Sequence, residues 1–461
     1  MRTQAEIAQI RYGLGLSPHV VSPTVPDDML DRLTRFDADA ARFPIPLFDA
    51  AHPTLLEQRL MRRERSAADR SGDPIAIAEV QARYQAQRKA RRDAEWLHFR
   101  TNLARGAWAE DAFRERLARF WGDHFTVASR VHESSHLVAP YIETAIRPNM
   151  TGRFADLLWA AVTHPMMIGY LDQGRSYGPN SVLGLRRGLG LNENLAREML
   201  ELHTLGIDGS YSQDDVRELA ELLTGLTYRP DRGLYFDAGR AEPGAETVLG
   251  RTYMAVADMS VLRAAVDDIA AHPDTAFHIA RKLVVHFIAD EPDTALVAAI
   301  AARFAETGGD LMAVYETLLT DAAAWEPEAQ KVKQPMGFVT STFRALGTDA
   351  ARIFDAQHTH IKNGIYVPMQ TMGQEWEHPI SPEGWPEEAE AWVTPQGMAG
   401  RINWAMTAPE RWVDELPDPR EFVVTALGNG ADAELRFAAH AAESVRDGVG
   451  IVLASAAFQR R

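Results

Sequence analysis

Apolar side chains recur every three or four positions along most of the chain, and this spacing predicts amphipathic helices. The stretch 233–254 alone shows a convincing β pattern, with strands expected at 234–236 and 247–249 on either side of a Pro-Gly turn. The stretch 363–396 mixes Trp with Pro, Gly and Glu and is expected to be irregular. The sequence therefore predicts a mainly α fold, a large multi-helix body with one small β-hairpin and one irregular Trp-rich segment.

The helical pattern continues through the chain without a low-complexity linker, so we expect residues 1–461 to form one helical domain. Three sub-regions are expected inside it. They are an N-terminal helical arm at 1–105, a core at 106–350 and a C-terminal cap at 351–461.

A strongly charged helical stretch at 54–105 is interrupted near residues 71–74, so two helices are expected there. Its part at 83–92 is rich in Arg, although the protein as a whole is acidic. Such a run is usually a solvated helix face. An arm that docks onto a partner protein is the alternative interpretation.

The 461-residue chain carries 48 Lys and Arg against 64 Asp and Glu, a formal net charge of −16. This excess of negative charge argues against nucleic acid or an anionic membrane surface as the main partner, and it leaves cations and small molecules open. Because the sequence contains no Cys, it excludes disulfides, thiolate zinc sites, iron–sulfur clusters and a Cys nucleophile.

The start of the chain lacks the apolar core of a signal peptide and lacks a twin-arginine pair. Nowhere does a run of about 18 apolar residues occur, which is the length that a membrane-spanning helix needs. The expected location is therefore the cytoplasm, and no insertion into a membrane is expected.

The stretch 188–206 holds the most informative pattern of the chain. Two glycines lead into it, Asn192 can cap a helix and Gly206 can end that helix. At about 100° per residue, His203 lies on the apolar side of the helix. A His in that position is more often a hydrogen-bonded core residue than a ligand.

The opposite face of the same helix gathers Asn194, Arg197, Glu198 and Glu201. The common explanation of such a stripe is a solvated face. The alternative is a face turned towards an internal cavity, where two carboxylates one turn apart, beside an amide and a guanidinium, can hold a cation or share a proton.

Two groups of aromatic residues are further candidates. His124 follows Trp121 within one helical turn, and a His beside aromatics is again more often part of the core. Trp376, Trp385 and Trp392 can line a binding cleft or merely cover the core.

Several stretches taken together resemble a known family. They are FWGDHF at 120–125, AIRP at 145–148, GRF at 152–154, HP at 164–165, YLD at 170–172, GPNS at 178–181, LNENLAREMLELHTLG at 191–206, GSY at 209–211, LTG at 223–225, ARKL at 280–283 with HF at 286–287, Lys333 with Pro335, GW at 384–385 and FQRR at 458–461. Over nearly its whole length, the chain resembles the bacterial family of proteins of unknown function catalogued as number 1800. The long motif at 191–206 is the most specific part of this resemblance.

The resemblance implies a mostly helical protein with a single body and brings no biochemical function with it. Such proteins are often encoded beside a protein similar to the alkaline phosphatase and sulfatase superfamily, which implies a protein partner of that kind. Because that neighbour can carry an export signal, export with it is the alternative to the cytoplasm. The chain departs from the family pattern at Gly122, where many members have His or another polar residue, and at Asn149 and Ala241, where many have His, and this argues against a His-rich metal centre.

Two functions are compatible with the sequence. The first is an enzyme with a metal-assisted or acid–base site in the helical core, where facing helices can direct side chains onto a divalent metal ion or a substrate. The residues expected in it are the catalytic Glu198, Glu201, Arg197 and Lys282, the substrate-binding Asn194, Asp172, Asn180 and Trp385, and the metal ligands His124, His203 and Glu198.

The second function is a non-catalytic binding or scaffold protein that acts with a partner, in which the same residues form a structural network. Other classes are less compatible with the sequence. A di-iron site of the ferritin type is disfavoured because Glu201-Leu-His203 is one residue short of the Glu-x-x-His step and has no second copy. The Gly-x-Ser-x-Gly elbow of serine hydrolases and the classical phosphate loops are also absent.

Overall fold

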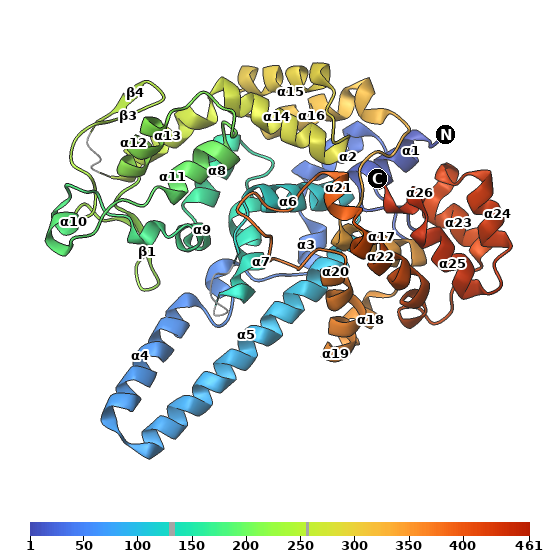
Figure 1. Ribbon diagram of the computed structural model, residues 1–461, viewed down its shortest axis with the longest axis horizontal. Helices are drawn as coiled ribbons and strands as arrows, with labels where there is room; N and C mark the ends of the chain where they lie inside the picture. The colour runs from blue at the N-terminus through green and yellow to red at the C-terminus, as the bar shows by residue number, and fades with distance from the viewer. Residues whose placement is uncertain (129–133, 255–257) are drawn as a thin grey trace.

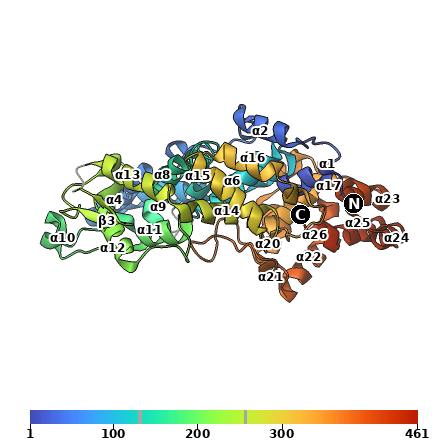
Figure 2. The same ribbon diagram turned by 90° about the horizontal axis from the view of Figure 1, so that it is seen from above.

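The computed structural model describes residues 1–128, 134–254 and 258–461, and this part of the chain is mainly helical, which confirms the predicted fold class. Figure 1 shows an elongated body from which the helical hairpin of α4 and α5 projects, and Figure 2 shows the same body from above. Both chain ends lie in the half of the body that is far from the β-strands. Within the described residues, no helix is long and apolar enough to cross a membrane.

The helices up to the first strand are α1 Gln4–Ile7, α2 Pro26–Thr34, α3 Ala38–Arg42, α4 Leu55–Ser71, α5 Pro74–Trp108, α6 Ala112–His124, α7 Val138–Tyr141, α8 Phe154–Val162, α9 Pro165–Tyr170, α10 Val182–Arg187, α11 Asn194–Glu198 and α12 Gln213–Leu222. The strands are β1 Leu226–Arg229, β2 Gly233–Phe236, β3 Glu246–Val248 and β4 Arg251–Tyr253. The helices after them are α13 Met259–Ala270, α14 Pro273–Phe287, α15 Thr294–Glu306, α16 Leu311–Thr320, α17 Pro335–Leu346, α18 Ala350–Asp355, α19 His358–Ile361, α20 Val367–Thr371, α21 Ala389–Trp392, α22 Pro395–Thr407, α23 Pro419–Leu427, α24 Ala433–His440, α25 Val445–Ala454 and α26 Ala456–Gln459.

The projecting hairpin confirms the two helices expected in 54–105. Thr54 caps α4 with a full capping box, and Gly72, at φ 65, ends the helix in the left-handed conformation. Asp73 then caps α5, and Pro74 takes its first position, where a missing N–H costs nothing.

Two large apolar clusters form the core. The larger one joins α6, α8 and α11 to α16, and the fully buried Trp121 donates a hydrogen bond of 2.6 Å to the hydroxyl of Tyr315 within it. The smaller one joins the C-terminal half of α5 to α17 and the helices after it. In both, the buried side chains recur at the helical spacing that the sequence shows.

The β-structure lies in the expected region, but its pairing differs from the prediction. β1 pairs with β2, and β3 pairs with β4, both antiparallel, so the strands expected at 234–236 and 247–249 belong to two different hairpins. The reason is the turn at Leu249 and Gly250, with φ values of 50° and 75°. Two residues with positive φ make the tight turn that matches the twist of an antiparallel pair, so the chain reverses there.

The helix expected after Asn192 is present, but its N-cap is Glu193, which makes no side-chain capping hydrogen bond. Asn192 precedes this cap, and its side-chain oxygen accepts a hydrogen bond of 3.0 Å from the backbone N–H of Asn194. After α11 the chain continues through residues 199–203 as a wider π-helical turn, which ends at His203 with Thr204 as its C-cap, and Gly206, at φ 90°, follows in the turn after it. A Cβ atom at Gly206 would lie 2.7 Å from Nδ1 of His278, so this close approach requires glycine. Such π-helical turns are frequent at functional sites.

The Trp-rich segment is irregular between residues 373 and 388, with α20 before it and α21 after it. It lies across α6 and α14. The backbone N–H of Trp385 donates to the carboxylate of Asp123 on α6, and the carboxylate of Glu387 lies 2.5 Å from Nδ1 of His286 on α14.

Candidate functional site

A cleft of about 640 Å³ opens where four parts of the chain meet. Its walls are the C-terminal end of α6, the middle of α14, the turn at 201–209 and the irregular segment at 380–388. Ile207, Phe277 and Ile380 also line it and are 67%, 54% and 92% exposed. Polar groups inside a cleft whose mouth carries apolar side chains are typical of a small-molecule site.

Asp123, in the last turn of α6, stands in the wall of this cleft. Its two carboxylate oxygens lie 3.0 and 3.1 Å from the backbone nitrogen of Trp385. Burial raises the pKa of Asp123 to about 7. The negative charges of Glu387 and Glu383 add to this rise, whereas the N–H of Trp385 and the positive charge of Lys282 oppose it. A carboxyl group with this pKa can gain and lose its proton near neutral pH, as a general acid or base must.

Three histidines pack close together at the same place. The ring of His124 lies 6.0 Å from that of His203 and 6.4 Å from that of His278. Burial lowers the pKa of His203 to about 3 and that of His278 to about 4, and it lowers the pKa of His124 well below the ordinary value, so all three are neutral. Nε2 of His124 lies 3.2 Å from the carbonyl oxygen of His203, which agrees with the expectation of hydrogen-bonded core histidines.

Four of the residues expected from the sequence meet in this cleft, namely His124, Glu201, Lys282 and Trp385. Burial lowers the pKa of Lys282, while the carboxylates around it, Asp123 first among them, raise that pKa. Trp385 is the tryptophan of its segment that lines the cleft, whereas Trp392 is 2% exposed and belongs to the core.

The rest of the polar face of α11 is a partly solvated surface. Arg197 pairs with Glu193 at 2.8 Å and with Glu201 at 3.2 Å, one turn away on each side. Asn194 is exposed, and Glu198 is half-buried, with a pKa raised by burial and by the charge of Glu201. These polar residues therefore form a solvated helix face, which is the common explanation given above for a polar stripe of this kind.

Asp172 and Asn180 lie outside the cleft and hold loops. The backbone carbonyl of Asp172 accepts a hydrogen bond of 3.2 Å from the side chain of Asn192. The backbone and side-chain amides of Asn180 both donate to the carboxylate of Glu242, at 2.9 and 2.6 Å. Neither residue lines the cleft around Lys282.

The expected metal ligands His124, His203 and Glu198 are not brought together as a set. In the described ranges, their donor atoms do not come within 4.8 Å of one another. A divalent ion held by these three side chains would therefore need a different arrangement of α6 and α11.

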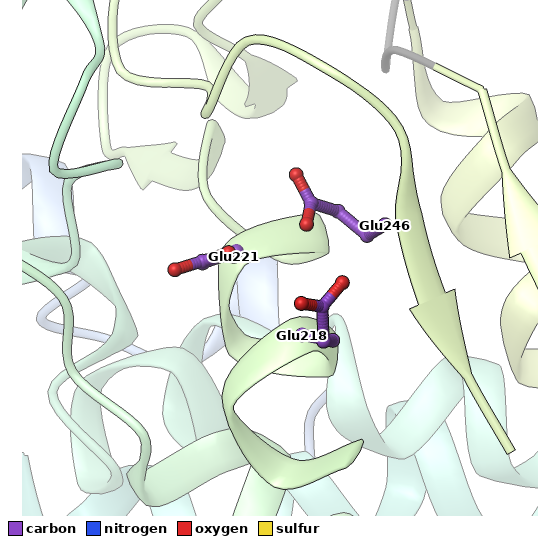
Figure 3. A group of neighbouring side chains, drawn as sticks. All are labelled: Glu218, Glu221 and Glu246. Atoms are coloured by element: carbon purple, nitrogen blue, oxygen red, sulfur yellow. The ribbon is translucent and has the colours of Figure 1, made fainter. Parts of the chain in front are cut away.

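Three carboxylates do come together on another part of the surface, and among the described residues they are the one group with the spacing of metal ligands. Glu218 and Glu221 lie on α12 and Glu246 lies on β3, and Figure 3 shows their carboxylates side by side. Burial raises the pKa of Glu246 to about 8, and its two acidic neighbours add to this rise. A proton held by Glu246 therefore relieves the repulsion within this group.

This proton gives a prediction for stability. Because the pKa of Glu246 is about 8 in the folded state and about 4.3 in an unfolded chain, the folded state loses stability as the pH rises from about 4.3 to 8. We expect Glu246→Gln to raise Tm by about 2–4 °C at pH 8 and to change it much less at pH 5, measured by thermal unfolding. The exposed Glu434→Gln is the matched control and should leave Tm unchanged at both pH values. An equal effect of Glu246→Gln at both pH values would contradict the shared proton.

Glu387 anchors the irregular segment to the protein interior. Its carboxylate lies 2.5 Å from Nδ1 of His286, 3.4 Å from Nζ of Lys331 and 3.7 Å from a guanidinium nitrogen of Arg461. Burial alone would raise its pKa, but His286, Lys331 and Arg116 together outweigh burial and bring the pKa to about 2. Glu387 is therefore ionised at every ordinary pH.

Asp123 and Glu387 are not among the functional residues expected from the sequence. A signal for Asp123 exists, since it lies inside the FWGDHF stretch at 120–125 beside His124. For Glu387 no local signal exists, because it is one of several acidic residues in a segment without periodicity and its partners lie on α14 and after residue 330.

A family model described as "Protein of unknown function (DUF1800)" matches residues 8–460. Neither curated proteins nor solved structures give a match to the chain. The family match spans all four walls of the cleft.

Proposed function

The chain belongs to this family of proteins of unknown function, and we propose that it is an enzyme whose cleft works by general acid–base catalysis. Asp123 carries the proton, and Lys282 places a positive charge beside it. The observation that carries this proposal is a carboxyl group with a pKa of about 7 in the wall of a cleft of about 640 Å³, next to a lysine.

Asp123 and Lys282 have complementary roles in this proposal. At neutral pH Asp123 is present in both protonation states, so it can accept a proton from a substrate or donate one to a leaving group. Lys282 can stabilise negative charge that develops on the reacting group, since a fixed charge acts strongly in a partly buried site. Glu201 lines the same cleft and is available for substrate contacts. The neutral His124 and His203 keep the wall behind Asp123 free of competing charge.

The acid–base form of this enzyme is favoured over the metal-assisted form, because the donor atoms of His124, His203 and Glu198 do not converge in the described ranges. The proposal is tested by incubating the protein with a small-molecule extract of cells and following the compounds by mass spectrometry. We expect defined compounds to be consumed and others to appear, and we expect neither change with Asp123→Asn. Ligands that are bound but never converted would instead indicate a binding protein.

A binding or scaffold function is the second candidate, and the projecting hairpin of α4 and α5 favours it. Residues 55–92 carry ten Lys and Arg against five Asp and Glu, in a chain of net charge −16. The hairpin is held by its own contacts, such as the 3.0 Å ion pair of Arg83 with Glu64 and the guanidinium of Arg65 over the ring of Tyr84. A protein partner with an acidic surface fits this arm.

The arm also gives a prediction. Replacement of residues 64–84 by a short turn should change the Tm of the body by less than about 2 °C, because this part of the hairpin packs mainly on itself. It should also leave the turnover of the proposed enzyme unchanged. Thermal unfolding and the extract assay measure both effects. A large loss of turnover with an unchanged Tm would assign the arm to the catalytic reaction instead of to a partner.

A further inference from the structure

A second, smaller cavity of about 170 Å³ adjoins the cleft, and we call it the inner cavity because its lining includes the buried side chains of Arg116, His286, Lys333 and Arg461. Asp123, Trp385 and Glu387 line both spaces, so the irregular segment and the end of α6 form the boundary between them. At about 30 Å³ per molecule, the inner cavity has room for roughly five or six waters or for one small ion. Its other walls come from α6, from the start of α17 and from the end of the chain.

Four cationic side chains line this inner cavity, namely Arg116, Arg119, Lys333 and Arg461. Arg116, Lys333 and Arg461 are 7%, 7% and 4% exposed. Cations are rarely buried to this extent unless a partner compensates their charge.

Lys333 has no such partner within the described part of the chain. Its Nζ donates to the hydroxyl of Ser341 at 3.1 Å and lies 3.9 Å from the centre of the Phe458 ring, but no carboxylate lies within 4.0 Å of it. Burial, together with the positive charges of Arg2 and Arg401 and of Arg116, lowers the pKa of Lys333 to about 7. An anion in the cavity would restore the charge of this ammonium group.

Several nitrogens in the cavity wall also lack a hydrogen-bond partner among the described residues. They are Nε and Nη2 of Arg116 and Nε and Nη1 of Arg461. Buried donors in folded proteins nearly always have an acceptor, which here can only be water or a ligand.

The carboxyl groups around the cavity do not balance these cations. Glu387 is ionised but already faces His286, Lys331 and Arg461. Burial raises the pKa of Asp123 to about 7 and that of Glu377 well above the ordinary value, so neither provides a full negative charge at neutral pH. The inner cavity therefore has an excess of positive charge and of unused hydrogen-bond donors.

We propose that the inner cavity binds a tetrahedral oxyanion, the phosphate or sulfate group of the substrate, on the side chains of Arg116, Lys333 and Arg461. Guanidinium groups match the oxygens of such an anion with two parallel hydrogen bonds, and the ammonium group adds a compact charge. Lys333 has no carboxylate partner, and Arg116 and Arg461 share Glu387 with Lys331, which favours an anion with two charges over a single carboxylate. Water alone could fill the space, but it would leave the charge of Lys333 uncompensated and Arg116 with only a share of the Glu387 carboxylate.

This assignment rests on the proposed function in one respect, since it treats the anion as part of the substrate. Because Asp123 lines both spaces, a substrate held by its phosphate or sulfate in the inner cavity would present its next atoms to that carboxyl group. Binding of the anion itself does not depend on catalysis, so it can be measured separately.

The test is isothermal titration calorimetry of the full chain with inorganic phosphate, sulfate, methyl phosphate and acetate at pH 7. We expect phosphate, sulfate and methyl phosphate to bind at one site, and acetate to bind much more weakly. Lys333→Met and Arg116→Gln should each weaken phosphate binding by about 30-fold or more, since each removes a buried partner of the anion. Lys89→Met removes the same charge from the exposed face of α5 and should bind phosphate like the wild-type protein.

Each result has a clear meaning. Without phosphate, Lys333→Met should be at least as stable as the wild-type protein, because it removes an uncompensated buried charge. If it fails to fold, Arg116→Gln still tests the site.

The proposal is overturned if the wild-type protein binds neither phosphate nor sulfate, if both variants bind as well as the wild type, or if acetate binds best. Binding of inorganic phosphate without methyl phosphate would overturn the substrate part. Asp123→Asn should keep phosphate binding while losing turnover, so failure of the proposed catalysis and failure of the anion site are distinguishable.

Discussion

Asp123→Asn is expected to reduce turnover by about 100- to 10,000-fold while the protein stays folded, because the amide has the shape of the carboxyl group but cannot exchange a proton. The side chain can still lie against the N–H of Trp385, through the remaining carbonyl oxygen. At pH 8 the wild-type protein must hold a buried, ionised carboxylate at Asp123, which costs stability. The neutral amide avoids this cost, so Tm at pH 8 should not fall. Turnover of a compound found in the extract assay, measured with equal amounts of both proteins, checks this expectation.

The pH profile of the wild-type protein is the second measurement on Asp123. If this group acts as the base, the rate should rise about tenfold per pH unit below 7 and level off above it; if it acts as the acid, the rate should fall above 7. Asp208→Asn is the matched control, because Asp208 lines the same cleft but is exposed, and it should change the rate little. A profile that is flat between pH 6 and 8, or an equal loss in both variants, would exclude Asp123 as the proton carrier.

Local features of the fold could be predicted because the signals for them are local. The break at 71–74 stops one helix with Gly72 and starts the next with Pro74, and the structure follows it closely. A capping box formed by Ser212 and Asp215, three residues apart, likewise begins α12. The strand pairing was wrong because the sequence holds turn signals both at 243–244 and at 249–250, and the two-residue turn of Leu249 and Gly250 pairs β3 with β4.

The site could be predicted only in part, since it depends on contacts between distant segments. His124, Glu201, Lys282 and Trp385 meet in one cleft, and their motifs mark them. Which acidic residue would face them depends on the path of the irregular segment at 380–388, which has no periodicity to predict it.

A glycine explains how that segment reaches Asp123. Gly384, at φ 92, brings the backbone so close that a Cβ atom there would lie 2.7 Å from the carbonyl oxygen of Asp123. Only glycine allows this approach, and the approach places the N–H of Trp385 on the carboxylate of Asp123. The polar face of α11 is mostly solvated. Arg197 pairs with Glu193 and Glu201 one turn away on each side, and such pairs look the same in sequence whether they face solvent or a cavity.

Arg147→Met is expected to lower the free energy of unfolding by about 3–5 kcal/mol, the largest stability effect that we predict. The guanidinium of Arg147 lies 2.5 Å from the carboxylate of Asp37 and also pairs with Glu115, whose side chain is 5% exposed. Burial would raise the pKa of Glu115, but Arg147 and Arg105 outweigh it and lower that pKa. Removal of Arg147 leaves Glu115 charged and buried without its main partner, and chemical unfolding measures the cost.

A double variant separates the ion pair from the packing around it. Arg147→Met combined with Glu115→Gln should recover part of the loss, because no uncompensated charge then remains. The depressed pKa of Glu115 stabilises the wild-type protein above the unfolded pKa of about 4.3, and this contribution disappears as the pH falls through the folded pKa. The deficit of Arg147→Met should therefore shrink below pH 4, whereas the exposed Arg186→Met should have almost no effect at any pH. A deficit that is independent of pH and unchanged in the double variant would mean that lost packing, and not the charge of Glu115, is responsible. The residues of the proposed site, Arg116 and Asp123, follow Glu115 on the same helix, so this buried ion pair also fixes the position of the site relative to the rest of the core.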